Sequence, residues 1–243
     1  MFLEENPYIR FKPNIYTDLL ANNWQTIRDE LFALCVKEKT RGPNGWLANP
    51  TNTGQDKVNG VTDNFGDYLY TGRFNGFSIY IRDTLSDGKE KTAMRWRADE
   101  KERWWPWRCE QMPWIGNYAR EFHSVLGSVT FNTAYPGSRL NHHWGLDPDY
   151  LRIHVCLESA AGCRFNIEGW EHEWTDGEVF GFDDAYVLHG TAHTGTKPRT
   201  IMLLDIKKSA LKEHCLTWPC RGFKPERSEW PAIQKRCTEI KTV

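Results

Sequence analysis

The fold of this chain is decided by the stretch YLRIHVCL, residues 150–157. Apolar side chains at positions 151, 153 and 155 alternate with Arg152 and His154, which is the two-residue period of a β-strand with one apolar and one polar face. Burying an arginine or a histidine is unfavourable unless it meets a charge or a hydrogen-bonding group. The stretch therefore predicts a strand whose polar face looks toward a functional site.

Four more short runs on either side have a similar strand-like composition, rich in β-branched and aromatic residues. Turn-forming pairs such as Pro136-Gly137 and Asp176-Gly177 separate the runs. The predicted strands are Ser128–Ala134, Tyr150–Leu157, Cys163–Ile167, Glu178–Phe182 and Thr200–Ile206. Strands this short and this closely spaced are typical of a β-sandwich or barrel. The expected fold class is mainly β with flanking helices (α+β).

Two amphipathic helices are predicted before these strands. The first repeats apolar residues every three or four positions over residues 24–35, with Thr17 and Asp18 as capping residues before it. The second covers residues 114–126, and Gly127 is expected to end it. Both helices are expected to pack on the outside of the β core.

The region between the helices is less regular. Residues 48–78 are rich in Asn, Gly, Thr and Asp, and we interpret them as loops around short strands. Residues 95–114 interleave arginine with tryptophan, and such a segment either stacks on a ligand ring or packs as an aromatic edge of the core. The balanced charge of the chain favours packing.

Composition excludes several classes of protein. The 243 residues include 31 Lys and Arg against 32 Asp and Glu, so no nucleic-acid partner is expected. No apolar run reaches the length of a membrane helix and no signal peptide is recognisable, so no membrane partner is expected. The seven cysteines include no C-x-x-C pair, which indicates reduced thiols and a cytoplasmic location.

One domain is predicted for residues 1–243. Its N-terminal part, 1–127, is expected to be helical and rich in loops. Residues 128–206 are expected to form the β core that carries the site, and 207–243 an irregular C-terminal tail.

Two histidines of the β half are candidate metal ligands. His143 and His189 are each expected on a loop beside a strand. Non-haem Fe(II) oxygenases hold iron with two histidines and usually one carboxylate, which leaves positions open for substrate and oxygen. In the common His-x-Asp/Glu form the carboxylate stands two residues after the first histidine, where this chain has Gly145. The His-x-Gly tripeptide is a weak signal by itself.

Two arginines of the β half suggest an anionic ligand. Arg152 lies on the polar face of its strand, and Arg199 directly precedes the apolar run at 200–204. A dicarboxylate needs a cation, and arginine binds carboxylates through two parallel hydrogen bonds. The alternative is that both arginines form structural ion pairs with Asp183, Asp184 or Glu158. The residues alone do not decide between these interpretations.

The chain resembles the aspartyl/asparaginyl β-hydroxylase family of Fe(II)/2-oxoglutarate-dependent oxygenases. The resemblance begins at Asn23–Glu30, is strongest between Asn132 and Asp205, and returns at Pro231-Ala232-Ile233, with residues 40–115 poorly matched. The matching motifs are Tyr135-Pro136-Gly137-Ser138, His143-Trp144-Gly145, Leu151-Arg152-Ile153-His154, Gly162-Cys163, Trp174, Gly177-Glu178, Phe182-Asp183-Asp184, His189, Arg199 and Asp205. The resemblance implies a double-stranded β-helix (jelly-roll or cupin-like) core.

The resemblance also implies roles for individual residues. His143 and His189 match the ligands of Fe(II), which binds O2 as cosubstrate, and Gly145 matches a glycine of the family, with water completing the iron site. Arg152 and His154 match the pair at the 1-carboxylate end of 2-oxoglutarate. Arg199 matches the arginine that binds the distal carboxylate, and Asn132 stands where the family usually has a serine that assists it.

One departure concerns the substrate. Tyr150 occupies the position of a family arginine that is implicated in binding the acidic group of the substrate. Its loss weakens the case for an aspartyl side chain as the substrate.

The expected function is hydroxylation of an unactivated C–H bond in an amino-acid, peptide or metabolite substrate. One alternative is a halogenase of the same cofactor class, in which chloride binds iron at the vacant Gly145 position. A second is a non-catalytic cupin-like binding protein that docks through residues 95–114, although such a protein has no reason to keep the metal-binding residues.

Overall fold

The computed structural model describes residues 6–37, 70–72, 74–82, 102–145, 147–217, 226–237 and 241–242. Most of the predicted loop region at 48–78 and the beginning of the arginine- and tryptophan-rich segment, at 95–101, lie outside the described residues. None of the described helices is long and apolar enough to cross a membrane.

Twelve described strands form two six-stranded sheets. The first sheet consists, in spatial order, of β3 (Glu102–Trp104), β2 (Phe74–Arg82), β4 (Leu126–Ala134), β11 (Arg199–Lys207), β6 (Tyr150–Glu158) and β9 (Val179–Phe182). The second sheet consists of β1 (Tyr70–Thr71), β5 (Arg139–His143), β10 (His189–His193), β7 (Cys163–Ile167), β8 (Trp170–Glu173) and β12 (Lys241–Thr242).

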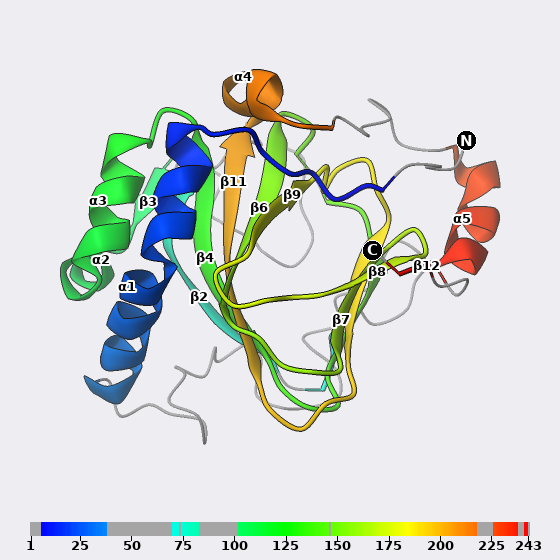
Figure 1. Cartoon of the computed structure of the whole chain (residues 1–243), viewed down its shortest axis with the longest axis horizontal. Coiled ribbons are helices and arrows are strands. Elements are labelled where there is room, and N and C mark those ends of the chain that lie inside the picture. Colours follow the sequence, from blue (N-terminus) through cyan, green and yellow to red (C-terminus); the bar gives the residue numbers. More distant parts are fainter. Residues whose placement is uncertain are drawn as a thin grey trace.

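The chain passes back and forth between the sheets, and the sheets face each other (Figure 1). From β4 to β11 the chain enters the first sheet at β4, β6, β9 and β11 and the second at β5, β7, β8 and β10. Neighbouring strands in this range pair antiparallel. This is the topology of a double-stranded β-helix, as the resemblance implied.

The first sheet has two different faces because its strands alternate in side-chain type. Its outer face is apolar and packs on helices α1 (Ile15–Lys37), α2 (Pro106–Gln111) and α3 (Pro113–Glu121) (Figure 1). The largest contributors to this layer include Ile27, Leu31, Ile115, Phe131, Ile153, Val155, Met202 and Leu204. The inner face carries Arg152 and His154 toward the second sheet, so the alternation predicted for residues 150–157 is confirmed.

Both predicted helices exist, but their ends differ from the prediction. Helix α1 begins at Ile15 because Asn14 caps it, its Oδ1 accepting the N–H of Thr17 at 3.0 Å, while Asp18 Oδ2 accepts the N–H of Asn14 at 3.0 Å. The second helix ends at Glu121, and Gly127 lies inside β4. A Cβ at Gly127 would lie 2.8 Å from the Tyr150 ring, so packing rather than helix termination requires this glycine.

All five predicted strands are present within two residues of their expected ends. The strands β5 and β10 were missed, as were β3, β8 and β12, whereas β1 and the beginning of β2 lie in the region 48–78 that was expected to hold short strands. Strands β5 (RLNHH) and β10 (HGTAH) contain few apolar side chains because they carry site residues, so their strand period is hidden.

The predicted irregular tail is wrong for the described part of residues 207–243. It contains helix α4 (Lys208–Leu211), the short 3₁₀ turns η1 (Lys212–His214) and η2 (Arg227–Glu229), helix α5 (Trp230–Arg236) and strand β12. Helix α5 stands on the side of the molecule opposite α1–α3 (Figure 1).

The described part of the arginine- and tryptophan-rich segment is packed. Trp104 lies against Tyr80 with ring centroids 4.3 Å apart, and Trp114 stacks on Tyr118 at 5.8 Å. The Arg108 guanidinium lies over the Trp107 ring at 5.2 Å. These contacts agree with an aromatic edge of the core rather than an open stacking platform.

Candidate functional site

His143 and His189 meet on neighbouring strands of the second sheet. His143 is the last residue of β5 and His189 the first of β10, and the two are paired directly across the strands. Their ring centroids lie 4.3 Å apart. The expectation that both lie on loops is therefore wrong. Both are strand residues at the same end of the β5–β10 pair. Because they pair across the two strands, the register of β5 against β10 sets the distance between their rings.

Both histidines are oriented in the same way. His143 Nδ1 lies 2.8 Å from the carbonyl oxygen of Asn141, and His189 Nδ1 lies 3.0 Å from that of Val187. A carbonyl only accepts, so these bonds assign the ring proton to Nδ1 and leave a lone pair on Nε2. Metal-binding histidines are commonly fixed through this arrangement.

Asp184 lies between the histidines and Arg152. Its Oδ1 is 3.1 Å from His189 Nε2 and 3.1 Å from Arg152 Nη1. Burial opposes ionisation of this carboxyl group, but Arg152 and the two histidines hold its pKa well below the usual range. Asp184 is thus a buried carboxylate, and Arg152 is its partner.

The contact between His189 and Asp184 requires a positive charge. With its proton on Nδ1, His189 turns a lone pair toward Asp184 Oδ1, and two lone pairs at 3.1 Å repel each other unless a proton or a cation lies at Nε2. Two imidazoles beside a carboxylate are donors that suit a divalent transition metal. In the described part of the chain no group of three His, Cys, Asp or Glu side chains could itself hold a metal ion. The two histidines are therefore the candidate ligand pair.

Asp184 also explains Gly145. A Cβ at Gly145 would lie 1.5 Å from Asp184 Oδ2 and 2.3 Å from its Cγ. The backbone N–H of Gly145 donates to the carbonyl oxygen of Asp184 at 2.7 Å, which keeps the two residues together. In a His-x-Asp motif an aspartate side chain would start at position 145. In this chain the Asp184 carboxylate, 39 positions further along, fills that space. In the sequence, Asp183 and Asp184 stand shortly before His189, and this proximity was the available signal for a carboxylate at the site. Both had been expected only as ion-pair partners of the arginines.

The two candidate arginines differ in their surroundings. Arg152 donates to both oxygens of Asp205, at 2.9 and 3.1 Å, as well as to Asp184. For Arg152 the structure therefore contains the ion pairs that the sequence left open. Its assignment to the 1-carboxylate end of 2-oxoglutarate stays a prediction.

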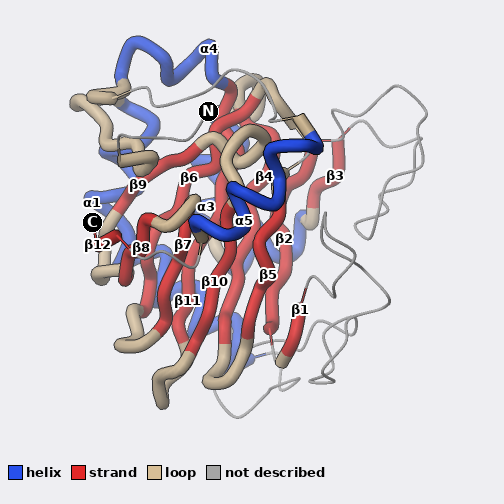
Figure 2. Tube along the Cα trace, turned by 90° about the vertical axis from the view of Figure 1, so that its right-hand side faces the viewer, coloured by secondary structure: helices blue, strands red, loops and turns tan. Residues whose placement is uncertain are grey.

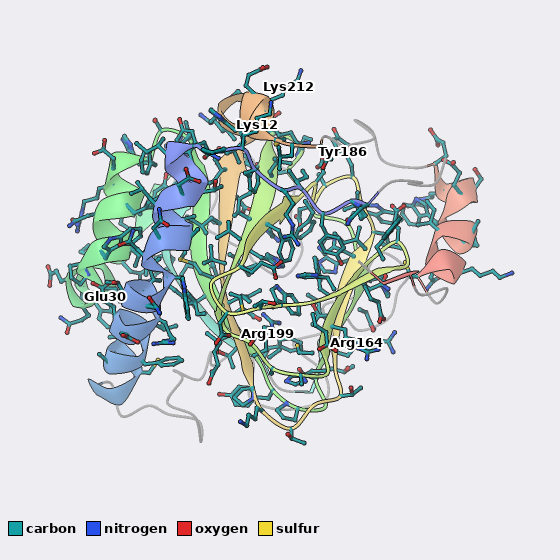
Figure 3. The ribbon with its side chains drawn as sticks, viewed as in Figure 1. Lys12, Glu30, Arg164, Tyr186, Arg199 and Lys212 are labelled. Atoms are coloured by element: carbon teal, nitrogen blue, oxygen red, sulfur yellow. The ribbon has the colours of Figure 1, made fainter. Side chains whose placement is uncertain are left out.

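Arg199 lies in the space between the sheets (Figure 3) and is 2% exposed. Its guanidinium stacks over the Trp174 ring at 4.5 Å, while Nε and Nη1 have no hydrogen-bond partner. No carboxylate of the described residues lies within ion-pair distance of it. A buried cation without an anion is unfavourable, so this position is suited to an anionic ligand.

Trp174 connects Arg199 to His154. Its indole N–H donates to His154 Nδ1 at 3.4 Å, which places the proton of His154 on Nε2. His154 is 4% exposed and is surrounded by the rings of Phe165, Phe180 and Phe182. Burial, followed by Arg199 and Arg152, lowers its pKa well below the usual value, so this histidine is neutral.

Asn132 and Tyr150 complete the predicted set. Asn132 pairs with Ile201 across β4 and β11, two residues from Arg199, and its hydrogen bond to a ligand stays a prediction. Tyr150 is 5% exposed, and burial raises its pKa to about 12. A buried neutral phenol thus stands where the family has a cation.

Three histidines, of which His154 is buried and His142 and His143 are partly buried, make the stability depend on pH. Burial lowers the pKa of His142 to about 4 and that of His143 to about 3, and that of His154 is also lowered. Because the unfolded chain binds these protons near pH 6.5, the free energy of unfolding should be highest above that value. It should fall as the pH drops, by up to about 1.4 kcal/mol per pH unit for each histidine.

Urea unfolding of the metal-free protein between about pH 7.5 and 5 measures this slope. His154→Phe should reduce the slope, whereas His123→Ala, at an exposed position, should leave it unchanged. A stability that does not change over this range would contradict the burial of neutral histidines.

Comparison with known proteins gives one family. The family described as Aspartyl/Asparaginyl beta-hydroxylase matches residues 21–209. Aspartate beta-hydroxylase domain-containing protein 2 of Homo sapiens is 28% identical over 87 residues, which are 35% of this chain and 23% of that protein. The protein of the same name from Rattus norvegicus has the same identity, over 25% of its length. The chain thus matches about a quarter of the length of these curated relatives.

Among solved structures, a similar one is an oxidoreductase of the 2OG-Fe(II) oxygenase family from Burkholderia pseudomallei. Its TM-score is 0.42 with 15% identity, and the match covers 58% of this chain and 71% of that one.

Proposed function

This chain belongs to the aspartyl/asparaginyl β-hydroxylase family, and from that premise we propose that it is an Fe(II)/2-oxoglutarate-dependent dioxygenase. Its reaction would be hydroxylation of an unactivated C–H bond in an amino-acid, peptide or metabolite substrate. The observation that carries the proposal is Arg199, a buried guanidinium in the same β core as the paired histidines, for which the described residues supply no counter-ion. A site with this pair and this cation suits a metal ion and a dicarboxylate.

In this proposal His143 and His189 hold Fe(II) through their Nε2 atoms. Their Nδ1–H groups donate to the carbonyl oxygens of Asn141 and Val187, so both rings are already oriented before the ion binds. Bound Fe(II) supplies the activation of O2 that is coupled to oxidative decarboxylation of 2-oxoglutarate. The protein contributes orientation and exclusion of water.

The cosubstrate would lie across the inner face of the first sheet. Arg199 binds its distal carboxylate with two donors, assisted by the Asn132 amide. His154 donates from Nε2 toward the 1-carboxylate end, with Arg152 beside it. The aromatic rings around His154 exclude water, which strengthens each of these charged hydrogen bonds.

Asp184 favours hydroxylation over halogenation. Halogenation would need chloride at the position vacated by the missing carboxylate, and Asp184 Oδ2 lies 1.5 Å from where a Gly145 Cβ would stand. An ionised carboxylate there repels chloride and occupies its space. The oriented rings of His143 and His189 oppose the binding-protein alternative, because a non-catalytic domain gains nothing from two oriented imidazoles.

The substrate class follows in part from Tyr150. A buried phenol cannot pair with an acidic group as an arginine does. An amino-acid, peptide or metabolite substrate that is recognised without that arginine is therefore more consistent with the site than an aspartyl side chain. No nucleic-acid or membrane partner is part of the proposal.

We place this activity in the cytoplasm. The six described cysteines are buried and form no disulfide with one another, as expected for a protein of a reducing compartment.

The experiment that tests the function combines turnover with product mass. Purified protein is supplied with Fe(II), 2-oxoglutarate, O2 and chloride together with a panel of amino acids, peptides and metabolites. We expect succinate and a product that has gained one oxygen atom, in equal amounts, at every chloride concentration. A chlorinated product would establish the halogenase alternative instead. Absence of both Fe(II) binding and succinate would leave the binding protein.

A further inference from the structure

Helix α5 lies across the outer face of the second sheet, in front of its upper part in the view of Figure 2. It contributes to a small apolar cluster that is separate from the two larger cores. This cluster, here called the α5 cluster, consists of Trp144, Leu188, Ile233 and Cys237, with Trp230 at its edge.

The sheet side of the α5 cluster consists of the chain neighbours of the two histidines. Trp144 follows His143 and is 3% exposed, while Leu188 precedes His189 and is 0% exposed. Ile233 of α5 is 1% exposed and belongs to the same cluster, and the rings of Trp144 and Trp230 lie 4.9 Å apart. One helix face therefore covers the residues beside both candidate ligands.

A polar connection joins the end of α5 to the other side of His143. Asn166 of β7 donates from Nδ2 to the carbonyl oxygen of Cys237 at 3.4 Å. Its Oδ1 lies 3.2 Å from Nε2 of His142, the residue before His143. His143 is thus flanked by one residue packed under α5 and one linked to its C-terminal end.

On its β7 side, β10 is paired in regular register from His189 to His193, but its pairing with β5 is less regular. Strand β5 ends at His143, β10 begins at His189, and the pairing of β10 with β5 shifts register between His189 and Thr191. The ladder that sets the spacing of the histidines is therefore terminal and irregular. Packing from outside the sheet therefore adds to what this ladder fixes on the His143 side.

We propose that helix α5 positions the metal-binding pair, and that Ile233 is the positioning residue at the centre of its contact. The proposal rests on the proposed function, because it concerns how the pair binds its metal. Ile233 contacts no ligand; it acts through Trp144 and Leu188. Groups that orient metal ligands typically change metal affinity 10- to 100-fold when they are altered.

Cobalt(II) binding to the full-length, metal-free protein tests this. In Ile233→Ala, we expect the affinity for Co(II) to fall about tenfold, with a changed visible absorption spectrum of the bound ion. The matched control is Ile27→Ala in α1, which is equally buried but packs on the first sheet. This control should lower the melting temperature and leave the Co(II) affinity and spectrum unchanged.

A second variant keeps the test valid if Ile233→Ala does not fold. Ile233→Val removes one methylene and should keep the affinity within about twofold, while Trp230→Ala, at the edge of the cluster, should lower it by an intermediate factor. Unchanged Co(II) binding in folded Ile233→Ala and Trp230→Ala would overturn the positioning role, as would an equal loss in Ile27→Ala. Failure of the wild type to bind Co(II) would instead overturn the proposed metal site itself.

Discussion

The double variant His143→Ala/His189→Ala is expected to lose Fe(II)-dependent consumption of 2-oxoglutarate while it keeps its fold. Both side chains stand at strand ends. The His189 ring packs on Phe165 and Phe182, with ring centroids 5.8 and 4.8 Å apart, so its truncation costs some stability, but the two apolar cores of the sheets are built from other residues and should hold the fold. Altering groups that merely orient metal ligands lowers affinity or activity 10- to 100-fold. Removing both ligands should therefore lower turnover by more than about a hundredfold.

Succinate release and anaerobic Fe(II) titration measure the loss, and far-UV circular dichroism shows whether the fold persists. The control is the double variant His123→Ala/His214→Ala, which removes two histidines outside the site and should retain wild-type turnover. Wild-type decarboxylation by the site variant would show that the iron is bound elsewhere.

Arg199 is expected to be needed for binding and dispensable for stability. Arg199→Lys keeps the charge but loses the planar fork. A charge-assisted hydrogen bond is worth roughly 1.5–3 kcal/mol, so the affinity for 2-oxoglutarate should fall by about one to two decades. The affinity for Fe(II) should remain nearly unchanged, because no hydrogen bond or ion pair joins Arg199 to the candidate ligands His143 and His189 in the described structure.

Arg199→Met sharpens this test. Replacing a buried charge without an ion-pair partner by an apolar side chain of similar length is often neutral or stabilising. The free energy of unfolding of the ligand-free variant should therefore be no more than about 1 kcal/mol below that of the wild type, or should exceed it. Binding of 2-oxoglutarate should be lost. Arg164→Met, at a surface ion pair on the outer side of the second sheet (Figure 3), should change neither quantity measurably. A strongly destabilised Arg199→Met would mean that Arg199 serves the fold.

The strands β4, β6, β9 and β11 of the first sheet could be predicted because their chemistry is regular. Alternation over residues 150–157 and the apolar run at 200–204 produce a visible period wherever one face of a strand packs on helices. The same regularity revealed Arg152 and His154, which alternate with apolar residues, and Arg199, which directly precedes an apolar run. The family motifs added His143 and His189 as a pair.

The strands that carry the histidines had no such period. In β5 and β10 the side chains serve the site, so the pattern that identifies a strand is absent exactly where function is concentrated. The start of α1 was missed for a simpler reason: Asn14 precedes the apolar repeat by ten positions, and its capping role depends on backbone geometry.

The sequence by itself therefore determined the β-rich class, the inward-facing polar residues and the candidate ligands. Tertiary structure alone decided which charges meet. It paired Arg152 with Asp184 and Asp205, and it brought Asp184 into the space beside Gly145. It placed no carboxylate of the described residues beside Arg199. These outcomes depend on distances between residues 32 to 53 positions apart in the chain. Only the crossing of the chain between two sheets sets such distances, and no local period encodes them.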